Sequence, residues 1–221
     1  RDSHTISSMT RYHSKPDTAK KPKKLPRAEK SELIRKKLLD AAASVVGEFG
    51  YRDASITLIA QRAGVANGTF YNYFETRQDL FDVLLPIVGQ NLLAYIRKNM
   101  DPDLTGIERE RARYRAYVDN TNKNPGFGRI LDEAAVYAPK AFIAHLQTFA
   151  SGYERSLRRS HERGEITGFS ERELPAIVFM LMGARSYFNI LNDVNEFAEI
   201  RPSLEELEET YIKMLERGLF G

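Results

Sequence analysis

The spacing of apolar residues along the chain is helical from about residue 31 onward. The first such stretch predicts one helix, because its apolar residues recur every three or four positions and so share a face. Gly50 follows it, and glycine readily takes the positive φ with which many helices end, so we expect the helix to stop there. The residues on this face are Ile34, Leu38, Ala42, Val45 and Phe49.

Two short helices are predicted next, joined by a tight turn at Ala63, Gly64 and Val65. Ser55 is the expected N-cap of the first, because its side-chain oxygen can accept a bond from a free backbone N–H. The second is too short to be a core helix, and it carries polar and aromatic residues. This is the form of a helix-turn-helix, whose second helix enters the major groove of DNA. Those residues are Asn67, Thr69, Tyr71, Asn72 and Tyr73.

A long helix is predicted from Arg77 to about Asn99. It opens with Thr76 to Asp79, which resembles a capping box with Asp in place of the usual Glu. Pro86 lies inside it and removes one backbone hydrogen bond, so we expect a kink there. The rest stays helical and no strand pattern is convincing, so we expect an all-α fold. Further helices are expected near residues 104–122, 127–137, 139–163, 171–193 and 203–219.

The composition is typical of a globular chain. Hydrophobic residues make up 42% of the 221 residues, enough for one large or two modest domains with a real core. No run approaches the roughly 18–20 apolar residues needed to span a bilayer, and the N-terminus has no apolar signal region. Cysteine is absent, which excludes disulfides and fits a reducing compartment. We therefore expect a cytoplasmic protein with no membrane partner.

Positive charge is concentrated toward the N-terminus. Residues 1–80 hold 15 Lys and Arg against 9 Asp and Glu, a net charge of +6, so the remainder carries −3 of the total +3. This asymmetry predicts that a polyanion meets the N-terminal end. Residues 1–26 are polar and rich in proline and lysine, so we expect a flexible segment. Two interpretations are open: a basic arm whose Lys23, Lys24 and neighbouring Arg27 contact DNA, or a solvated tail without a partner.

Several short elements between residues 50 and 80 form one pattern: Gly50-Tyr51, Ser55, Ile59-Ala60, Ala63-Gly64-Val65, Gly68-Thr69-Phe70-Tyr71, Tyr73-Phe74, Thr76-Arg77 and Leu80. With them, residues 30–82 resemble the tetracycline-repressor (TetR) family of bacterial transcription regulators. The resemblance implies a three-helix helix-turn-helix domain over residues 27–76. The long helix would join it to a helical domain over residues 77–221 that binds a small-molecule effector and forms a homodimer.

The same resemblance places DNA contacts on the second short helix and its flanks. Groups expected at base edges are Asn67, Thr69, Tyr71 and Asn72, with Gly68 allowing close approach of the backbone. Groups expected to bind phosphates, and so to position the domain without reading sequence, are Ser55, Tyr73 and Arg77. Thr57 is a further phosphate candidate, and the alternative is a surface threonine without a DNA contact. Phe70 and Phe74 are expected in the core, and for Tyr71 a partly buried position is the alternative.

Three positions depart from the family pattern. Ala66 stands where the family usually has Ser or Thr, so a capping hydroxyl worth about 1 kcal/mol is lost. Asn72 stands where His is common, so no base preference is carried over from relatives. Arg77 stands where Lys is usual.

The last two predicted helices, near residues 171–193 and 203–219, are implied by the resemblance to form the dimer interface. Gly183 and Ala184 would allow helices to approach closely there. A twofold dimer presents two recognition helices to a palindromic site about one turn apart. The alternative is that both helices only complete the core of a monomer.

Arg185 stands out because it lies in a largely apolar helix, where a buried guanidinium needs a counter-charge. Either Glu133 forms a structural ion pair with it, or it holds an acidic group of an effector. The expected effector-binding residues are Arg185, Glu133, Tyr137, His145, Phe149 and Tyr117. His145 has no neighbouring ligands in the sequence, so no metal and no cofactor is expected.

The motifs of the common enzyme classes are missing, including Walker loops, nucleophile elbows and dinucleotide fingerprints, so we expect no enzyme. The interpretation is a ligand-responsive transcription regulator, most simply a repressor that binds a double-stranded DNA operator. Activation is a possible alternative mode, and a non-specific architectural DNA-binding protein is the competing class.

Overall fold

The computed structural model describes residues 26–193 and 202–220, and within them the chain is helical without strands, which confirms the all-α prediction. A 3₁₀ turn, η1, spans Glu171–Glu173. The helices are α1 Arg27–Asp53, α2 Ile56–Ala63, α3 Asn67–Phe70, α4 Arg77–Lys98, α5 Gly106–Lys123, α6 Phe127–Tyr137, α7 Pro139–Glu162, α8 Leu174–Asp193 and α9 Leu204–Gly218.

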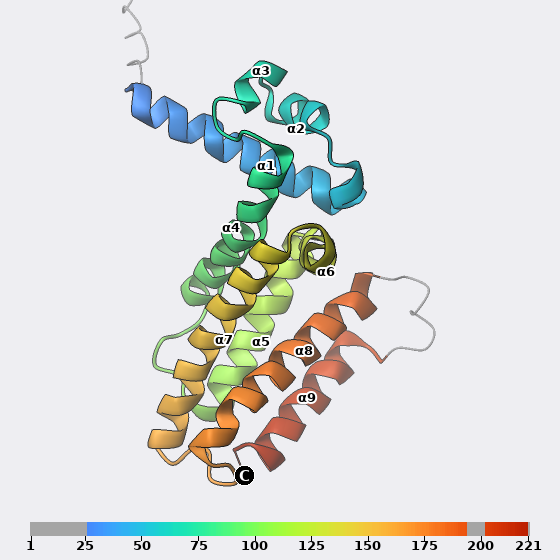
Figure 1. Cartoon of the computed structure of the whole chain (residues 1–221). Helices are drawn as coiled ribbons and strands as arrows, with labels where there is room; N and C mark the ends of the chain where they lie inside the picture. The colour runs from blue at the N-terminus through green and yellow to red at the C-terminus, as the bar shows by residue number, and fades with distance from the viewer. Residues whose placement is uncertain (1–25, 194–201, 221) are drawn as a thin grey trace, which may run out of the picture.

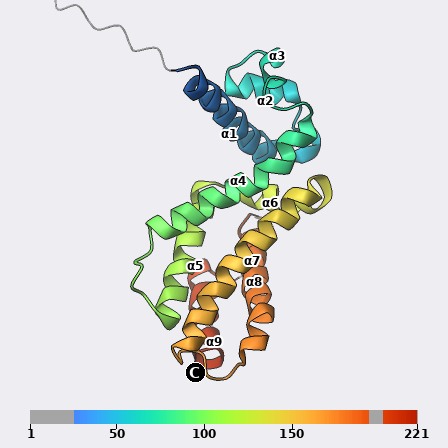
Figure 2. The ribbon, with the colours of Figure 1, turned by 60° about the vertical axis from the view of Figure 1, so that its left-hand side comes forward.

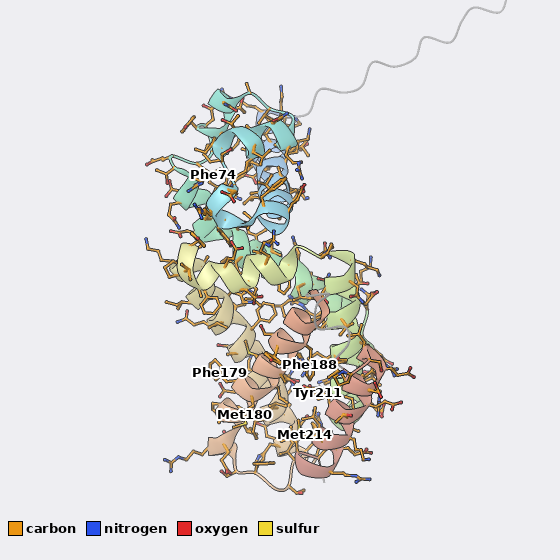
Figure 3. The ribbon with its side chains drawn as sticks, turned by 90° about the vertical axis from the view of Figure 1, so that its right-hand side faces the viewer. Phe74, Phe179, Met180, Phe188, Tyr211 and Met214 are labelled. Atoms are coloured by element: carbon orange, nitrogen blue, oxygen red, sulfur yellow. The ribbon has the colours of Figure 1, made fainter. Side chains whose placement is uncertain are left out.

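The molecule has two parts, as Figure 1 shows. Helices α1 to α3 form the head at one end, which comprises residues 27–76. Helix α4 leaves the head and joins α5, α7, α8 and α9 in an elongated bundle, which with α6 is here called the body (Figures 1 and 2). Helix α6 lies across the junction between the two parts, against α1 (Figure 3). The division expected at residue 76 falls where α4 begins.

Helix α1 ends where the glycine predicts. Gly50 has φ 82° and ψ 166°, so the regular helix stops there, and residues up to Asp53 form a separate turn. The helix begins at Arg27 instead of near Ser31, because the exposed residues 27–30 extend it into solvent without any apolar period. Glu29 in that first turn is favoured by the helix dipole.

The predicted caps of α2 and α4 are present. The backbone N–H of Leu58 donates to the Oγ of Ser55 over 3.2 Å. Thr76 and Asp79 form the complete capping box, in which the backbone N–H of Asp79 donates to the Thr76 hydroxyl at 3.1 Å and the carboxylate accepts from the Thr76 N–H at 2.8 Å. The first residue of each helix is therefore determined by a local hydrogen bond, between residues 55 and 58 for α2 and between residues 76 and 79 for α4.

The first hydrophobic cluster does not stop at the head. It includes Phe70 and Phe74, as predicted, and continues into the first half of α4 and into α6. Leu80, Leu84 and Ile130 are at most 2% exposed within it. The start of the body is thus part of the same core as the head.

Helix α4 is long and apolar enough, by length and composition alone, to cross a membrane, contrary to the expectation from the sequence. Its Leu80, Leu84, Leu85 and Leu92 are nevertheless buried in the protein. This is the environment of a core helix, which passes the same compositional test. The helix span continues through Pro86.

The far end of the body has its own core between α5, α7, α8 and α9. Its buried residues include Tyr114, Leu157, Leu174, Ile212 and Leu215. A third, smaller cluster lies between α4, α5 and α6, around Leu92, Ile96 and Phe127.

Candidate nucleic-acid interface

Helices α2 and α3 form the predicted helix-turn-helix. Gly64 ends α2 with φ 69°, and its N–H is within reach of the carbonyls of Ala60 and Gln61. Helix α3 is a single turn, and the chain continues in turns, with the N–H of Tyr73 donating to the carbonyl of Phe70 at 3.0 Å. The predicted loss at Ala66 is confirmed, because no side chain caps α3.

The outer surface of α3 is polar and open. Asn67, Gly68 and Asn72 are exposed, and Tyr71 is 57% exposed, so the core interpretation of Tyr71 does not hold. A Cβ added to Gly68 would meet nothing within 4 Å, so this part of the surface is bare backbone. Thr69 is half-buried. A duplex can therefore approach the backbone of α3 without a side chain intervening.

Side chains at the interface also contact one another. The Nδ2 of Asn67 donates to the Oγ1 of Thr57 over 3.2 Å and so links α3 to α2. The Oγ of Ser55 accepts from the Leu58 N–H, which leaves its own proton free to donate to a phosphate oxygen. The hydroxyl of Tyr73 lies 3.5 Å from the Oγ of Ser31 on α1.

Arg77, an expected phosphate contact, also binds other residues of the head and of α4. Its Nη1 donates to the carbonyls of Arg52 and Ala54 at 3.3 and 3.4 Å. Its guanidinium also lies over the ring of Phe81, 5.4 Å from the centroid. The residue thus holds the segment between α1 and α2 while it remains exposed.

The basic arm is only partly within the structure. Arg27 is exposed in the first turn of α1. Lys23 and Lys24 lie outside the described residues.

Arg62 is a residue that the sequence analysis missed. It joins α2 to α1, donating to the Oγ of Ser44 at 2.6 Å and to the carboxylate of Glu48 at 2.8 Å. Its partners lie 18 and 14 residues upstream on another helix, and no local sequence signal identifies such a pair.

A family model described as bacterial regulatory proteins of the tetR family matches residues 38–84. These residues include α2 and α3, the second half of α1 and the first turns of α4. Residues 38–84 therefore belong to the TetR family of DNA-binding domains. The homologues are transcription regulators and not enzymes, in agreement with the expectation from the sequence.

Two curated relatives illustrate the extent of the similarity. The uncharacterized HTH-type transcriptional regulator YvdT of Bacillus subtilis (strain 168) is 39% identical over 72 residues, which cover 33% of this chain and 35% of the relative. The fatty acid metabolism regulator protein of the same organism is 34% identical over 67 residues, which cover 30% of this chain and 32% of the relative. The chain spans about a third of the length of the curated relatives it matches.

Solved structures extend the likeness in fold to most of the chain. The fatty acid degradation regulator FadR from Bacillus halodurans has a TM-score of 0.66 at 20% identity, covering 87% of this chain and 96% of that one. A TetR-like transcriptional regulator from Rhodococcus sp. RHA1 has a TM-score of 0.63 at 20% identity, covering 88% and 98%. The body therefore has the TetR-family fold as well as the head.

The expected ion pair between Arg185 and Glu133 is wrong. Arg185, 7% exposed, donates from Nη2 to the carboxylate of Glu110 at 2.9 Å and to the hydroxyl of Tyr153 at 2.7 Å. Arg113 binds the other oxygen of the same carboxylate. Burial raises the pKa of Tyr153 well above its ordinary value, so its hydroxyl keeps the proton that it donates to Glu110. The chain itself thus supplies the counter-charge of Arg185.

The six expected effector residues separate into three places in the body. Arg185 belongs to the cluster with Glu110, at the α5, α7 and α8 contact. Glu133 and Tyr137 lie on α6 at the head, where the Glu133 carboxylate accepts from the N–H of Tyr51 at 2.8 Å. A single site therefore cannot contain all six side chains.

The other three lie in the middle of the body. The rings of His145 and Phe149 are stacked, with their centroids 4.2 Å apart. The ring centroid of Phe127 lies 6.4 Å from that of His145. Tyr117 belongs to the same small cluster as Phe127. Burial lowers the pKa of His145 to about 4, despite a hydrogen bond with the backbone of Leu85, so this side chain is neutral at pH 7.

Proposed function

We propose that this TetR-family protein regulates transcription in the bacterial cytoplasm by binding operator DNA as a homodimer. The supporting observation is the open polar surface of α3, where Gly68 has no neighbour within 4 Å and Tyr71 and Asn72 are exposed. Thr69 and Asn67 complete the groups that would read base edges. Ser55, Thr57, Tyr73, Arg77 and the arm residues Lys23, Lys24 and Arg27 would bind phosphates and set the register.

The homodimer is proposed to form through α8 and α9. Each helix buries one face in the body, with Leu181 and Ile212 at most 4% exposed, and leaves apolar residues on the other. Phe179, Met180 and Met214 are 56%, 71% and 58% exposed and lie on the face that Figure 3 presents. An exposed apolar surface of this kind marks an interaction site. A twofold partner on this face would place two heads on a palindromic operator.

A small-molecule effector is proposed to bind in the body and to release the DNA. The aromatic cluster of Tyr117, Phe127, His145 and Phe149 supports a site there, since effector pockets are mostly apolar with few polar groups. Release upon binding corresponds to a repressor. By linkage, operator DNA must weaken effector binding by the same factor.

A salt-titrated binding experiment tests the DNA half. Duplexes selected from a random library are compared with unselected duplexes, by fluorescence anisotropy, for the parent and for Asn72→Ala and Tyr73→Phe. We expect selected sites to bind at least about 1,000-fold more tightly than unselected DNA, and both variants to bind the selected site less tightly. Equal affinities for both classes of duplex would favour the architectural alternative, and unchanged affinities of the variants would refute the assigned contacts.

A further inference from the structure

The segment from Gly50 to Ala54 is held from two helices of the body at once. From α6, the carboxylate of Glu133 accepts the N–H of Tyr51 at 2.8 Å. From α4, Arg77 donates to the carbonyls of Arg52 and Ala54. This segment leads directly into α2, so its position determines where α2 and α3 point.

Aromatic contacts also hold the segment from Gly50 to Ala54. Tyr51 is fully buried, with its ring 4.8 Å and edge-on from Phe81 of α4 and stacked at 6.1 Å on Tyr137 of α6. Arg129 of α6 also donates to the carbonyl of Glu48, near the end of α1. Polar and aromatic contacts thus both join the end of α1 to α6.

A second contact fixes the other end of α6. Gly47 of α1 lies against Gly126, just before α6, so closely that a Cβ on either would lie 2.6 Å from the Cα of the other. Neither glycine has a positive φ, so the backbone would accept alanine and the obstacle is purely steric. Carbon atoms pack at about 3.5–4.0 Å, so one added methyl must separate the two helices by about 1 Å.

Open space lies beside this contact. A groove of about 630 Å³ runs along it, lined among others by Ser44, Asn91, Asn120 and Lys123. The distance between α1 and α6 is therefore constrained by the close approach of the two glycines as well as by the apolar packing of Ile130 and Ala134 against α1.

We propose that Glu133, Gly47 and Gly126 are positioning residues for DNA binding. They are not among the residues assigned to DNA contact, but they hold α6 against α1 at two points and thereby set the orientation of the head and the distance between the two heads of a dimer. A change in this contact between α1 and α6 alters the spacing of operator half-sites that the dimer binds. The inference depends on the proposed function, because it concerns the geometry of the same DNA-binding surface.

The test begins with a site and half-site spacing selected by the parent from a random duplex library. Affinities are then measured for that site and for versions with one base pair inserted or removed between the half-sites. For Gly47→Ala and Gly126→Ala we expect about tenfold weaker binding to the parent spacing, comparable to a misplaced base contact, and a smaller loss, or a gain, at one altered spacing. The double variant should resemble each single one, because both methyls act on the same contact.

Glu133 supplies a variant that leaves the glycine contact intact. Glu133→Ala removes the acceptor of the Tyr51 N–H, whereas Glu133→Gln retains an acceptor, so we expect a larger shift for Ala than for Gln. Circular dichroism and thermal melting establish that each variant is folded. If Gly126→Ala fails to fold, the ranking of spacings by Glu133→Ala decides.

Matched controls separate positioning from general damage. Gly152→Ala adds a methyl to a helical glycine, where the new Cβ would lie 3.9 Å from the Nη2 of Arg155. Glu162→Gln removes a distant exposed charge. Both variants should bind like the parent. Asn72→Ala should weaken binding equally at all spacings. The inference is overturned if Gly47→Ala, Gly126→Ala and Glu133→Ala lose affinity by the same factor at every spacing or lose none. If the parent selects no sequence, the proposed function fails and this inference with it.

Discussion

The head and the body differ in what they bury. Among the described residues, every buried polar or charged side chain lies in the body: Glu110, Asn120, His145, Ser156, Ser160 and Arg185. The buried side chains of the head are apolar or aromatic, such as Leu38, Val45 and Phe70, with Tyr51 burying its hydroxyl as well. The core of the head is thus held by apolar packing, and its polar contacts, such as those of Arg62 with Ser44 and Glu48, lie at the surface. The core of the body, by contrast, contains hydrogen-bonded partners that lie far apart in sequence.

The largest effect is expected where the body buries charge. Glu110 is 1% exposed and binds both Arg185 and Arg113. Glu110→Ala leaves two guanidinium groups without their carboxylate, so we expect a loss of about 4 kcal/mol in the free energy of unfolding, measured with urea. A loss below about 1 kcal/mol would show that the network is not a determinant of stability.

A double variant sharpens the same test. Glu110→Leu with Arg185→Met replaces the ion pair with apolar groups of similar size and should cost less than Glu110→Ala alone. If the two replacements are instead strictly additive, the groups do not interact as the distances indicate.

The second effect is a pH dependence that only the body should show. Burial lowers the pKa of His145 to about 4, below the value of about 6.5 in an unfolded chain. The unfolded chain therefore takes up a proton below pH 6.5 while the folded chain stays neutral. Stability is retained above pH 6.5 and lost progressively as the pH falls toward 4, by up to about 3 kcal/mol.

His145→Leu is the matched control, because it cannot titrate. Urea unfolding at several pH values between 7 and 4 should give curves for the parent and the variant that converge or cross as the pH falls. Parallel curves over this range would mean that His145 has a normal pKa in the folded protein.

A smaller effect is expected from the local caps of the head. Thr76→Ala removes the hydroxyl that accepts from the N–H of Asp79 at 3.1 Å and should cost about 1 kcal/mol. Thermal melting measures the change. Thr76→Ser retains the hydroxyl and should restore most of the stability.

The smallest effect is expected at Ala66, where no side chain caps α3. Ala66→Ser supplies the absent hydroxyl and should raise the stability by about 0.5 kcal/mol. An unchanged or lowered melting temperature would show that the backbone at this position cannot use the cap.

Much of the head was predictable because its signals are local. The Thr76–Asp79 box, the end of α1 at Gly50 and the buried Phe70 all depend on residues within one or two turns. The bounds of α6, Phe127–Tyr137, follow equally from the glycine and proline that flank it. Of the expected DNA contacts, Asn67 and Gly68 of α3 and Tyr71 and Asn72 after it are exposed, and Arg77 has an additional bond to the backbone.

The partners in the body were not predictable from the same signals. Glu110 lies 75 residues from Arg185, in a stretch of α5 where acidic and basic residues alternate. The sequence of this stretch does not indicate which of the charged residues is buried. Glu133 was assigned to Arg185, but its carboxylate binds Tyr51, 82 residues away. Such pairs are decided by helix packing, which the periodicity of a single helix does not specify.

The stacking of two arginines on one tyrosine has a consequence for the outside of the molecule. Arg113 and Arg185 both lie against the ring of Tyr153, 4.5 and 4.9 Å from its centroid. Because the contact of Arg185 with this ring and its bond to Glu110 are directional, they favour the rotation of α8 about its own axis that the structure has. Apolar packing alone would tolerate several such rotations. The buried guanidinium thereby fixes which side chains α8 turns outward, so that Phe179 and Met180 face solvent and remain available to a second molecule.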